Sequence, residues 1–201
     1  MTIITPHWKR KLKIKAYSFS DQKTLIEILE PLREKGIKTL RVNKSLWNYF
    51  PKIRRTIEVP ASVMTGAWMG SDFSNDDLVK QASLAEDYHL DLFDLKTQWK
   101  VKLVPKEDLP TVWGHIEILI EKNSLLPLKQ TYFDEEGIRK RVLSFSKVKD
   151  FSGKKLPSQL LMKNLSKKGY QTIMHYQNIN FKPDFSENIF VPEKLQSKNL
   201  R

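Results

Sequence analysis

The chain has 201 residues, a length that suits one globular domain with a core of its own. Apolar residues make up 40% of it and charged residues 29%, which is a globular composition rather than that of a disordered chain. The absence of cysteine excludes disulfides, thiolate nucleophiles and cysteine-based zinc sites. No stretch approaches the roughly 20 consecutive apolar residues that cross a bilayer as a helix.

The chain is strongly basic, with 35 Lys and Arg against 23 Asp and Glu and a net charge of +12. Such a charge creates a broad positive potential that attracts anionic partners. Nucleic acid, anionic phospholipid headgroups and an acidic protein surface all fit it, and charge alone does not choose among them. A solvated basic surface without any partner fits equally well.

Apolar and polar residues alternate along the first part of the chain. In residues 8–17, Leu12, Ile14 and Ala16 alternate with lysines, which predicts a strand with one buried face and one wet face. Further strands are predicted at residues 24–29, 39–42, 46–50 and 55–59, and a turn at residues 43–45 joins the middle pair.

The second part of the chain predicts a longer meander of antiparallel strands between turn residues. The expected strands cover residues 89–95, 99–104, 112–120, 126–133, 138–148, 156–163 and 170–181. In the strand at 112–120, Ile116 and Ile118 share one face, and Trp113 and His115 share the other.

One helix is predicted over residues 74–86, with a weaker helical turn at 184–189. Ser74 is suited to the N-cap, Asp76 and Asp77 to an exposed first turn, and Leu78, Val79 and Ala82 to an apolar side. About ten strands do not form a flat sheet, because a strongly twisted sheet of that size curls. The expected fold is therefore mainly β (α+β): a strongly curved antiparallel sheet forming an incomplete barrel, with one or two short helices over or inside its concave face.

No pattern in the sequence is typical of an enzyme. The four histidines lie on separate predicted elements, and an acidic run from Asp72 to Asp87 is explained by the preference of helix N-termini for acids. A glycine-rich phosphate loop, a nucleophile elbow and a dinucleotide fingerprint are all absent from the sequence. We therefore predict no catalytic residues, no metal site and no cofactor.

A single-stranded nucleic-acid-binding module is the alternative that the sequence leaves open. Trp8 and Tyr17 accompany Lys9, Arg10 and the lysines that follow, and aromatic and cationic side chains together can bind single strands. Against this, the aromatics are not grouped on one short strand pair, and no RNA-recognition motif is present. Lysines alternating along a strand also protect a sheet edge from aggregation.

The segment from Pro60 to Phe73, called here the flap segment, is unusually apolar for a loop. Beside two glycines, which suggest a mobile element, it carries large apolar side chains at Val63, Met64, Trp68, Met69 and Phe73. A flexible apolar flap would suit a greasy ligand. The same residues would equally serve to plug one end of the core.

Residues 47–81 resemble the outer-membrane lipoprotein-sorting protein family, relatives of the LolA/LolB-like periplasmic carriers. The resemblance rests on a W-x-Y-x-P segment and a W-M-G-S-D-F-[ST]-N-D-D-L block, matched here by Trp47, Tyr49 and Pro51 and by residues 68–78. Outside this region, residues 1–18 and Val112-Trp113-Gly114-His115 are also similar to the family. Residues 60–64 depart from its usual pattern, which leaves the detail of the flap segment open.

The resemblance implies one carrier domain over residues 1–201, with an apolar cavity that takes a lipid or the acyl chains of a lipoprotein through the periplasm towards the outer membrane. It also implies that the family's signal peptide and first elements precede Met1. The implied partner is an inner-membrane transporter, the basic charge adds an anionic membrane surface as a candidate partner, and no nucleic acid is expected. The candidate lipid-binding residues are Trp47, Tyr49, Met64, Trp68, Met69 and Phe73.

Overall fold

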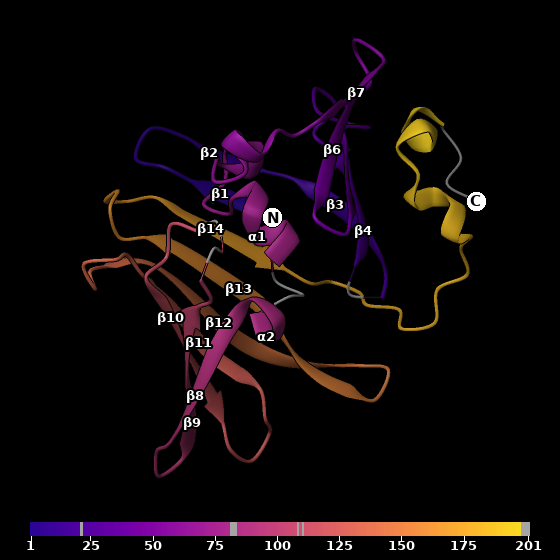
Figure 1. The fold of residues 1–201 in the computed structure, drawn as a ribbon. Coiled ribbons are helices and arrows are strands. Elements are labelled where there is room, and N and C mark those ends of the chain that lie inside the picture. The colour runs from indigo at the N-terminus through magenta and orange to yellow at the C-terminus, as the bar shows by residue number, and fades with distance from the viewer. Residues whose placement is uncertain (21, 81–83, 108, 110, 198–201) are drawn as a thin grey trace.

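A computed structural model describes residues 1–20, 22–80, 84–107, 109 and 111–197, apart from the side chains at 76, 79 and 80. Its strands form two antiparallel sheets (Figure 1). The larger sheet has nine strands, in the order β2 (Lys9–Lys11), β1 (Thr2–Ile4), β14 (Gln171–His175), β13 (Lys154–Asn164), β12 (Arg139–Phe151), β11 (Pro127–Phe133), β10 (His115–Glu121), β9 (Gln98–Pro105) and β8 (Tyr88–Asp94). The smaller sheet has five, in the order β3 (Lys13–Phe19), β4 (Lys23–Glu30), β5 (Lys38–Val42), β6 (Ser45–Phe50) and β7 (Arg55–Glu58).

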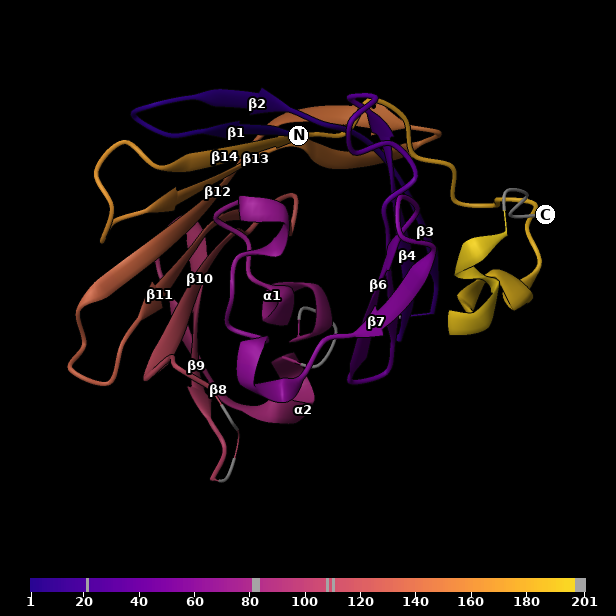
Figure 2. The ribbon, with the colours of Figure 1, turned by 90° about the horizontal axis from the view of Figure 1, so that it is seen from above.

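Short helices lie between the two sheets, on the concave side of the larger one (Figure 2). They are the 3-10 helices η1 (Ala61–Val63) and η2 (Trp68–Gly70) of the flap segment and the α-helices α1 (Asn75–Lys80) and α2 (Leu84–Asp87). The larger sheet stays open, because its outermost strands β2 and β8 pair on one side only. The expected incomplete barrel with helices inside its concave face is confirmed.

The predicted strand at residues 8–17 is two strands in two sheets. Lys9–Lys11 pairs with β1, whereas Lys13–Phe19 pairs with β4. Leu12, at the break, is buried against Ile3 of the larger sheet and Ile28 of the smaller one. The chain changes sheets there because this one side chain fills the junction between them, and alternation alone gives no sign of that bend.

Strand β1 lies outside every predicted strand, and the clearest of the other differences concern three predicted elements. The strand expected at 112–120 begins at His115, because Gly114 lies so close to the backbone of Asp134 that a Cβ atom would approach that carbonyl oxygen to 2.4 Å. The strand expected at 170–181 ends at His175, and the chain continues without regular structure. The helix expected over 74–86 is the pair α1 and α2, and residues 81–83 between them lie outside the described part.

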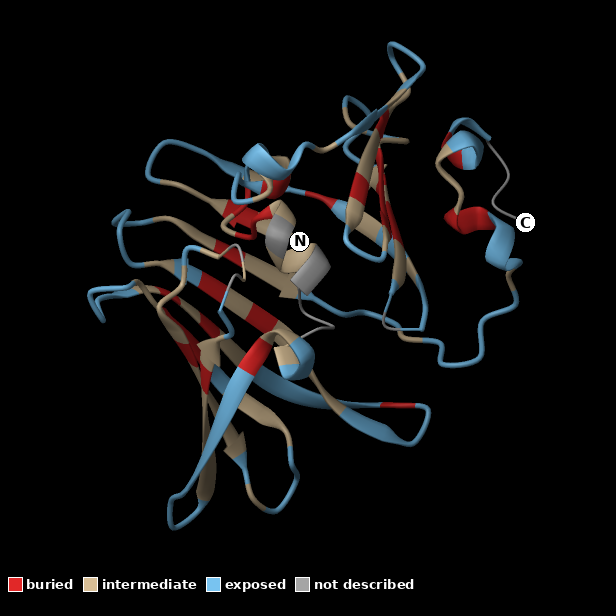
Figure 3. Cartoon of the chain, viewed as in Figure 1, coloured by how far each residue is buried: buried red, intermediate tan, exposed pale blue. Residues whose placement is uncertain are grey.

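The core is divided among three clusters. The largest lies on the concave face of the larger sheet and includes Phe73, Leu103 and Met162. A second lies on the outer face of the smaller sheet, and the third is the junction around Leu12. On β8, by contrast, only Tyr88 is buried, and the rest of this edge strand is exposed (Figure 3).

The C-terminal helices η3 (Glu187–Phe190) and η4 (Pro192–Gln196) cover the outer face of the smaller sheet. Ile189, Phe190 and Leu195 are buried there against that sheet. The buried ammonium of Lys38 donates hydrogen bonds to the carbonyl oxygens of Leu195 at 3.0 Å and Ser197 at 2.8 Å, which caps the end of η4. None of the helices among the described residues is long and apolar enough to cross a membrane.

This packing predicts that the C-terminal helices contribute to global stability. Leu195→Ala should lower the free energy of unfolding by about 2–5 kcal/mol, because Leu195 is fully buried. Leu32→Ala is the matched control: Leu32 is 86% exposed, so the same substitution should change stability by less than about 0.5 kcal/mol. Urea denaturation of both variants measures the difference, and equal effects would contradict the docked position of η4.

Candidate functional site

A cavity of 1860 Å³ lies between the two sheets. The concave face of the larger sheet supplies Ile116, Leu143, Leu160 and Met174, and the facing side of the smaller sheet supplies Ala16, Ile26 and Leu46. Trp68 and Phe73 of the flap segment, with Leu78 and Leu84 of the two α-helices, contribute further apolar surface. An apolar wall on all these elements is what a hydrocarbon ligand requires.

Polar side chains make up much of the rest of the cavity lining. Thr39 and Arg41 reach it from β5, and Gln130 from β11. The Gln130 amide donates to the hydroxyl of Tyr132 at 3.0 Å, and the Thr39 hydroxyl donates to Asn48 Oδ1 at 2.7 Å. Thr39 and Gln130 are therefore held by protein partners at the cavity wall.

The flap segment is tied to both sheets. The indole Nε1–H of Trp68 donates to Thr39 Oγ1 at 3.0 Å, and Trp68 is only 1% exposed. On the other side, the backbone N–H of Asp72 donates to Thr172 Oγ1 at 3.0 Å, and the Thr172 hydroxyl donates to Asp72 Oδ2 at 2.7 Å. The segment thus bridges β5 and β14 instead of moving freely over the cavity.

Helix α1 begins with a reciprocal cap. The N–H of Asp77 donates to Ser74 Oγ at 3.1 Å, and the N–H of Ser74 donates to Asp77 Oδ2 at 2.7 Å. The predicted N-cap at Ser74 is confirmed. The expectation that Asp77 is exposed is wrong, because this carboxylate faces the larger sheet.

Asp77 forms a two-bond ion pair with Arg141 of β12. Arg141 donates to its two carboxylate oxygens at 2.8 and 2.9 Å and to the carbonyl oxygen of Asp72 at 3.1 Å. The guanidinium lies 4.6 Å from the ring centroid of Trp113 and 4.5 Å from that of Tyr132. Burial lowers the pKa of Arg141, but the Asp77 carboxylate outweighs this effect and holds the pKa above its ordinary value.

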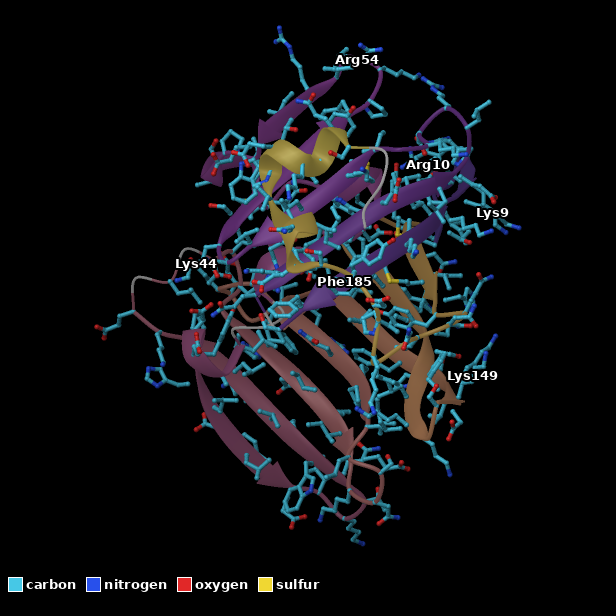
Figure 4. All side chains as sticks on the ribbon, turned by 90° about the vertical axis from the view of Figure 1, so that its right-hand side faces the viewer. Lys9, Arg10, Lys44, Arg54, Lys149 and Phe185 are labelled. Carbon is cyan, nitrogen blue, oxygen red and sulfur yellow. The ribbon has the colours of Figure 1, made fainter. Side chains whose placement is uncertain are left out.

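A strap without regular structure, residues 176–185, crosses from the larger sheet to the smaller one and lines the cavity. Near its start, the N–H of Tyr176 donates to the carbonyl oxygen of Ser158 at 2.9 Å. The ammonium of Lys149 donates to the carbonyl oxygen of Gln177 at 3.2 Å, and Phe181 lies under Lys154. At its end, Phe185 packs edge-on against Tyr17 at 5.6 Å (Figure 4).

The structure brings only two of the six candidate lipid-binding residues to the cavity, Trp68 and Phe73. Trp47 and Tyr49 lie on the opposite face of the smaller sheet, packed in the cluster beneath η3 and η4. The reason is strand alternation: Leu46 on the same strand faces the cavity, so its odd-numbered neighbours face away. Met69 packs in the junction cluster, and Met64 is half-buried in the flap segment without reaching the cavity lining.

Sequence reasoning missed the strap and the pairing of Asp77 with Arg141. Asn178, Asn180 and Pro183 disfavour a strand, so their spacing was a usable sign that β14 ends early. The ion pair joins residues 64 positions apart, and no local pattern indicates it. Trp113 was expected to face away from Ile116, but it lies before β10 begins, where alternation no longer applies, and it lines the cavity.

Comparisons with known proteins agree with this architecture. The model of a family described as uncharacterized protein-like matches residues 20–197, which is most of the chain. The chain belongs to this family. A comparison with curated protein sequences gives no match.

Three solved structures are similar over nearly the whole chain, at identities that show the fold alone. A Vibrio parahaemolyticus domain described as an outer membrane lipoprotein-sorting protein has a TM-score of 0.81 and 19% identity, covering 97% of this chain and 88% of its own. A LolA superfamily protein from Nitrosomonas europaea has a TM-score of 0.75 and 17% identity, covering 94% and 87%. A DUF1329 family protein from Desulfovibrio piger has a TM-score of 0.81 and 19% identity, covering 96% and 88%. The resemblance to the lipoprotein-sorting proteins is confirmed at the level of fold.

Asp77 of helix α1 and Asp72 of the flap segment should respond differently when their charges are removed. Asp77→Asn leaves the buried Arg141 guanidinium without its carboxylate, which should cost about 3–5 kcal/mol of unfolding free energy. Burial raises the pKa of Asp72, although its bond to Thr172 and the charge of Arg141 lower it, so the ionised form of Asp72 is disfavoured in the folded protein. Asp72→Asn keeps an acceptor for Thr172 and should leave the melting temperature at pH 7 unchanged or raise it.

The pH dependence follows from the direction of the Asp72 shift. A carboxyl whose pKa is raised by folding is destabilising when it ionises, above its folded pKa, and this penalty disappears below its unfolded pKa. Any advantage of Asp72→Asn at pH 7 should therefore shrink as the pH falls through the carboxyl range. Thermal melts of both variants from pH 7 downwards test this, and a large loss for Asp72→Asn at pH 7 would contradict it.

Proposed function

We propose that the protein is a carrier that holds a lipid, or the acyl chains of a lipoprotein, in the cavity between its two sheets. The observation that supports this most strongly is the size of the largely apolar cavity. At 1860 Å³ it exceeds the roughly 300–1,000 Å³ of most small-molecule pockets. Removing about 400 Å² of hydrocarbon from water would contribute about 10 kcal/mol, before the entropy cost of association.

A carrier needs a gate through which its cargo enters and leaves the cavity. The strap is a better candidate for this gate than the flap segment. The flap segment is bonded to both sheets by Trp68 and Asp72, so its opening would break buried contacts. The strap has no regular structure, and exposed contacts with the β12–β13 hairpin hold its first half. Its displacement would open the side of the cavity while leaving η3 and η4 docked.

The resemblance to lipoprotein-sorting proteins extends the proposal to the place of action. We infer a periplasmic carrier that receives its cargo from an inner-membrane transporter and moves it towards the outer membrane. Binding and release require no bond chemistry, so a non-enzymatic role agrees with the proposal. Among the described residues, no three His, Asp or Glu side chains are grouped closely enough to hold a metal ion.

The single-stranded nucleic-acid alternative gains no support from the placement of its aromatics. Trp8 precedes β2 of the larger sheet, whereas Tyr17 lies on β3 of the smaller sheet with its ring against Phe185. Stacking successive bases requires aromatic rings on a common open surface. These two rings do not share one.

Narrowing the cavity should weaken ligand retention without unfolding the protein. Ala16 faces the cavity and is exposed to it, so Ala16→Trp adds a large side chain while removing no core contact. Native mass spectrometry should find less co-purified lipid on the variant than on the wild type, and an apolar fluorescent probe should bind more weakly to the variant. The control is Leu119→Trp on the convex face, and normal lipid content in Ala16→Trp would contradict the cavity as the site.

Loosening the strap should speed release more than it weakens binding. Lys149→Met together with Phe181→Ser removes one hydrogen bond and one cation–π contact between the strap and the hairpin, worth roughly 1–2 kcal/mol together, and also the contact of Lys149 with Phe151 inside the hairpin. Dissociation of the probe, followed by stopped-flow fluorescence, should become about tenfold faster. Lys155→Met with Val148→Ser changes exposed residues of the same hairpin and is the matched control. Equal release rates for the two double variants would exclude the strap as the gate.

A further inference from the structure

Four turns at one end of the molecule combine exposed apolar and cationic side chains. They join β1 to β2 (residues 5–8), β4 to β5 (31–37), β6 to β7 (51–54) and β13 to β14 (165–170). The apolar members are Trp8 at 46% exposure, Leu32 at 86%, Ile53 at 58% and Leu165 at 48%. We call this set, with the adjoining residues 9, 10 and 55, the basic turn surface.

Contacts among the turns make this a connected surface. Arg10 forms an ion pair with Glu34 at 2.9 Å, which joins the end of β2 to the β4–β5 turn. Gly36 lies against Pro51, where a Cβ atom would be 3.5 Å from the proline ring, and Gly169 lies against Pro6 in the same way. Figure 4 shows Lys9, Arg10 and Arg54 along the upper side of the molecule.

The charge of this surface accounts for most of the charge of the protein. Its segments carry nine Lys or Arg residues and one acid, a net charge of +8 within the chain's +12. The acid is Glu34, which Arg10 already neutralises. The exposed cations at the tips, such as Arg33, Lys52 and Arg54, have no ion pair among those found in the described residues.

We propose that the basic turn surface docks on an anionic phospholipid membrane. Cations adjoining a leaflet of anionic lipids gain energy from its surface potential, and apolar side chains beside them can enter the headgroup region. Protection of sheet edges would explain the cations of β2 and β7, but it does not explain Leu32 or Ile53, which are exposed on turns. An acidic protein surface would use the cations and leave those side chains in water.

The basic turn surface lies next to the cavity, which suggests what membrane docking would serve. Pro31 belongs to the β4–β5 turn and also lines the cavity, as does Lys11, next to Arg10. A membrane bound at these turns therefore lies beside one margin of the cavity. A lipid could then pass between cavity and leaflet with little exposure to water, although docking itself does not depend on the cavity holding a lipid.

The test is co-sedimentation of the full chain with vesicles of phosphatidylcholine alone or mixed with phosphatidylglycerol. Binding should require phosphatidylglycerol and weaken with added salt. Arg54→Gln with Arg55→Gln should lower the partition coefficient about fivefold for each cation removed, the equivalent of about 1 kcal/mol each. Leu32→Ser with Ile53→Ser should lower it about tenfold at unchanged charge.

Lys129→Gln with Arg139→Gln is the matched control, because it removes the same charge from exposed positions on the convex face of the larger sheet. This control should bind like the wild type. Equal losses in the two charge variants would show unspecific attraction by net charge and overturn the proposal. The proposal would also be overturned if the protein bound polyglutamate as tightly as vesicles and if Leu32→Ser with Ile53→Ser had no effect on binding. That result would indicate an acidic protein as the partner instead.

The result of the vesicle-binding test can be distinguished from the result of the test of the proposed carrier function. Vesicle binding is measured on lipid-free protein, whereas carriage is measured as lipid retained by the cavity. Ala16→Trp, which narrows the cavity, should sediment with the vesicles like the wild type. A protein that retains lipid but fails to bind phosphatidylglycerol vesicles would remove the docking surface and leave the carrier intact.

Discussion

The arrangement of the site depends on one buried ion pair, between Arg141 of the larger sheet and Asp77 of helix α1. The guanidinium lies against the adjacent rings of Trp113 and Tyr132 and also donates a hydrogen bond to the backbone carbonyl oxygen of Asp72. A buried ion pair is weak evidence for stability, since apolar replacements can be equally stable. Here the ion pair fixes a position. It holds helix α1 and the flap segment at one place on the apolar wall, along which apolar contacts alone would let them slide.

The flap segment transmits this fixed position to the other sheet. Asp72 is bonded to the larger sheet through Thr172, and four residues earlier Trp68 is bonded to the smaller sheet through Thr39. The two sheets are also joined at the junction around Leu12, by the Arg10–Glu34 ion pair and by the strap. The distance between the sheets, and therefore the width of the cavity, is set largely by a short segment that the sequence marks as an apolar block.

Sequence alone predicted the antiparallel strands, the cap at Ser74 and the open curved sheet, because these follow from local alternation and turn chemistry. It did not predict the bend at Leu12, since the same alternation continues through both strands. Trp47 and Tyr49 were chosen as apolar and aromatic, but alternation places Leu46 on the cavity side, and the C-terminal helices that cover the other face begin about 140 residues later. Packing between residues far apart in the sequence decided which face of the smaller sheet lines the cavity and which face is packed in the core.

A large cavity between two sheets forgoes the close packing of protein side chains that stabilises ordinary interiors. In this fold the three core clusters offset the lost packing. They lie around the cavity and on the outer face of the smaller sheet. The fixed parts, Trp68 and the Asp77–Arg141 pair, occupy the end of the cavity nearest the helices, whereas the strap on its open side has mostly exposed contacts. In the carrier that we propose, stability and access are thereby assigned to different elements, so that the strap opens without loosening the elements that keep the sheets apart.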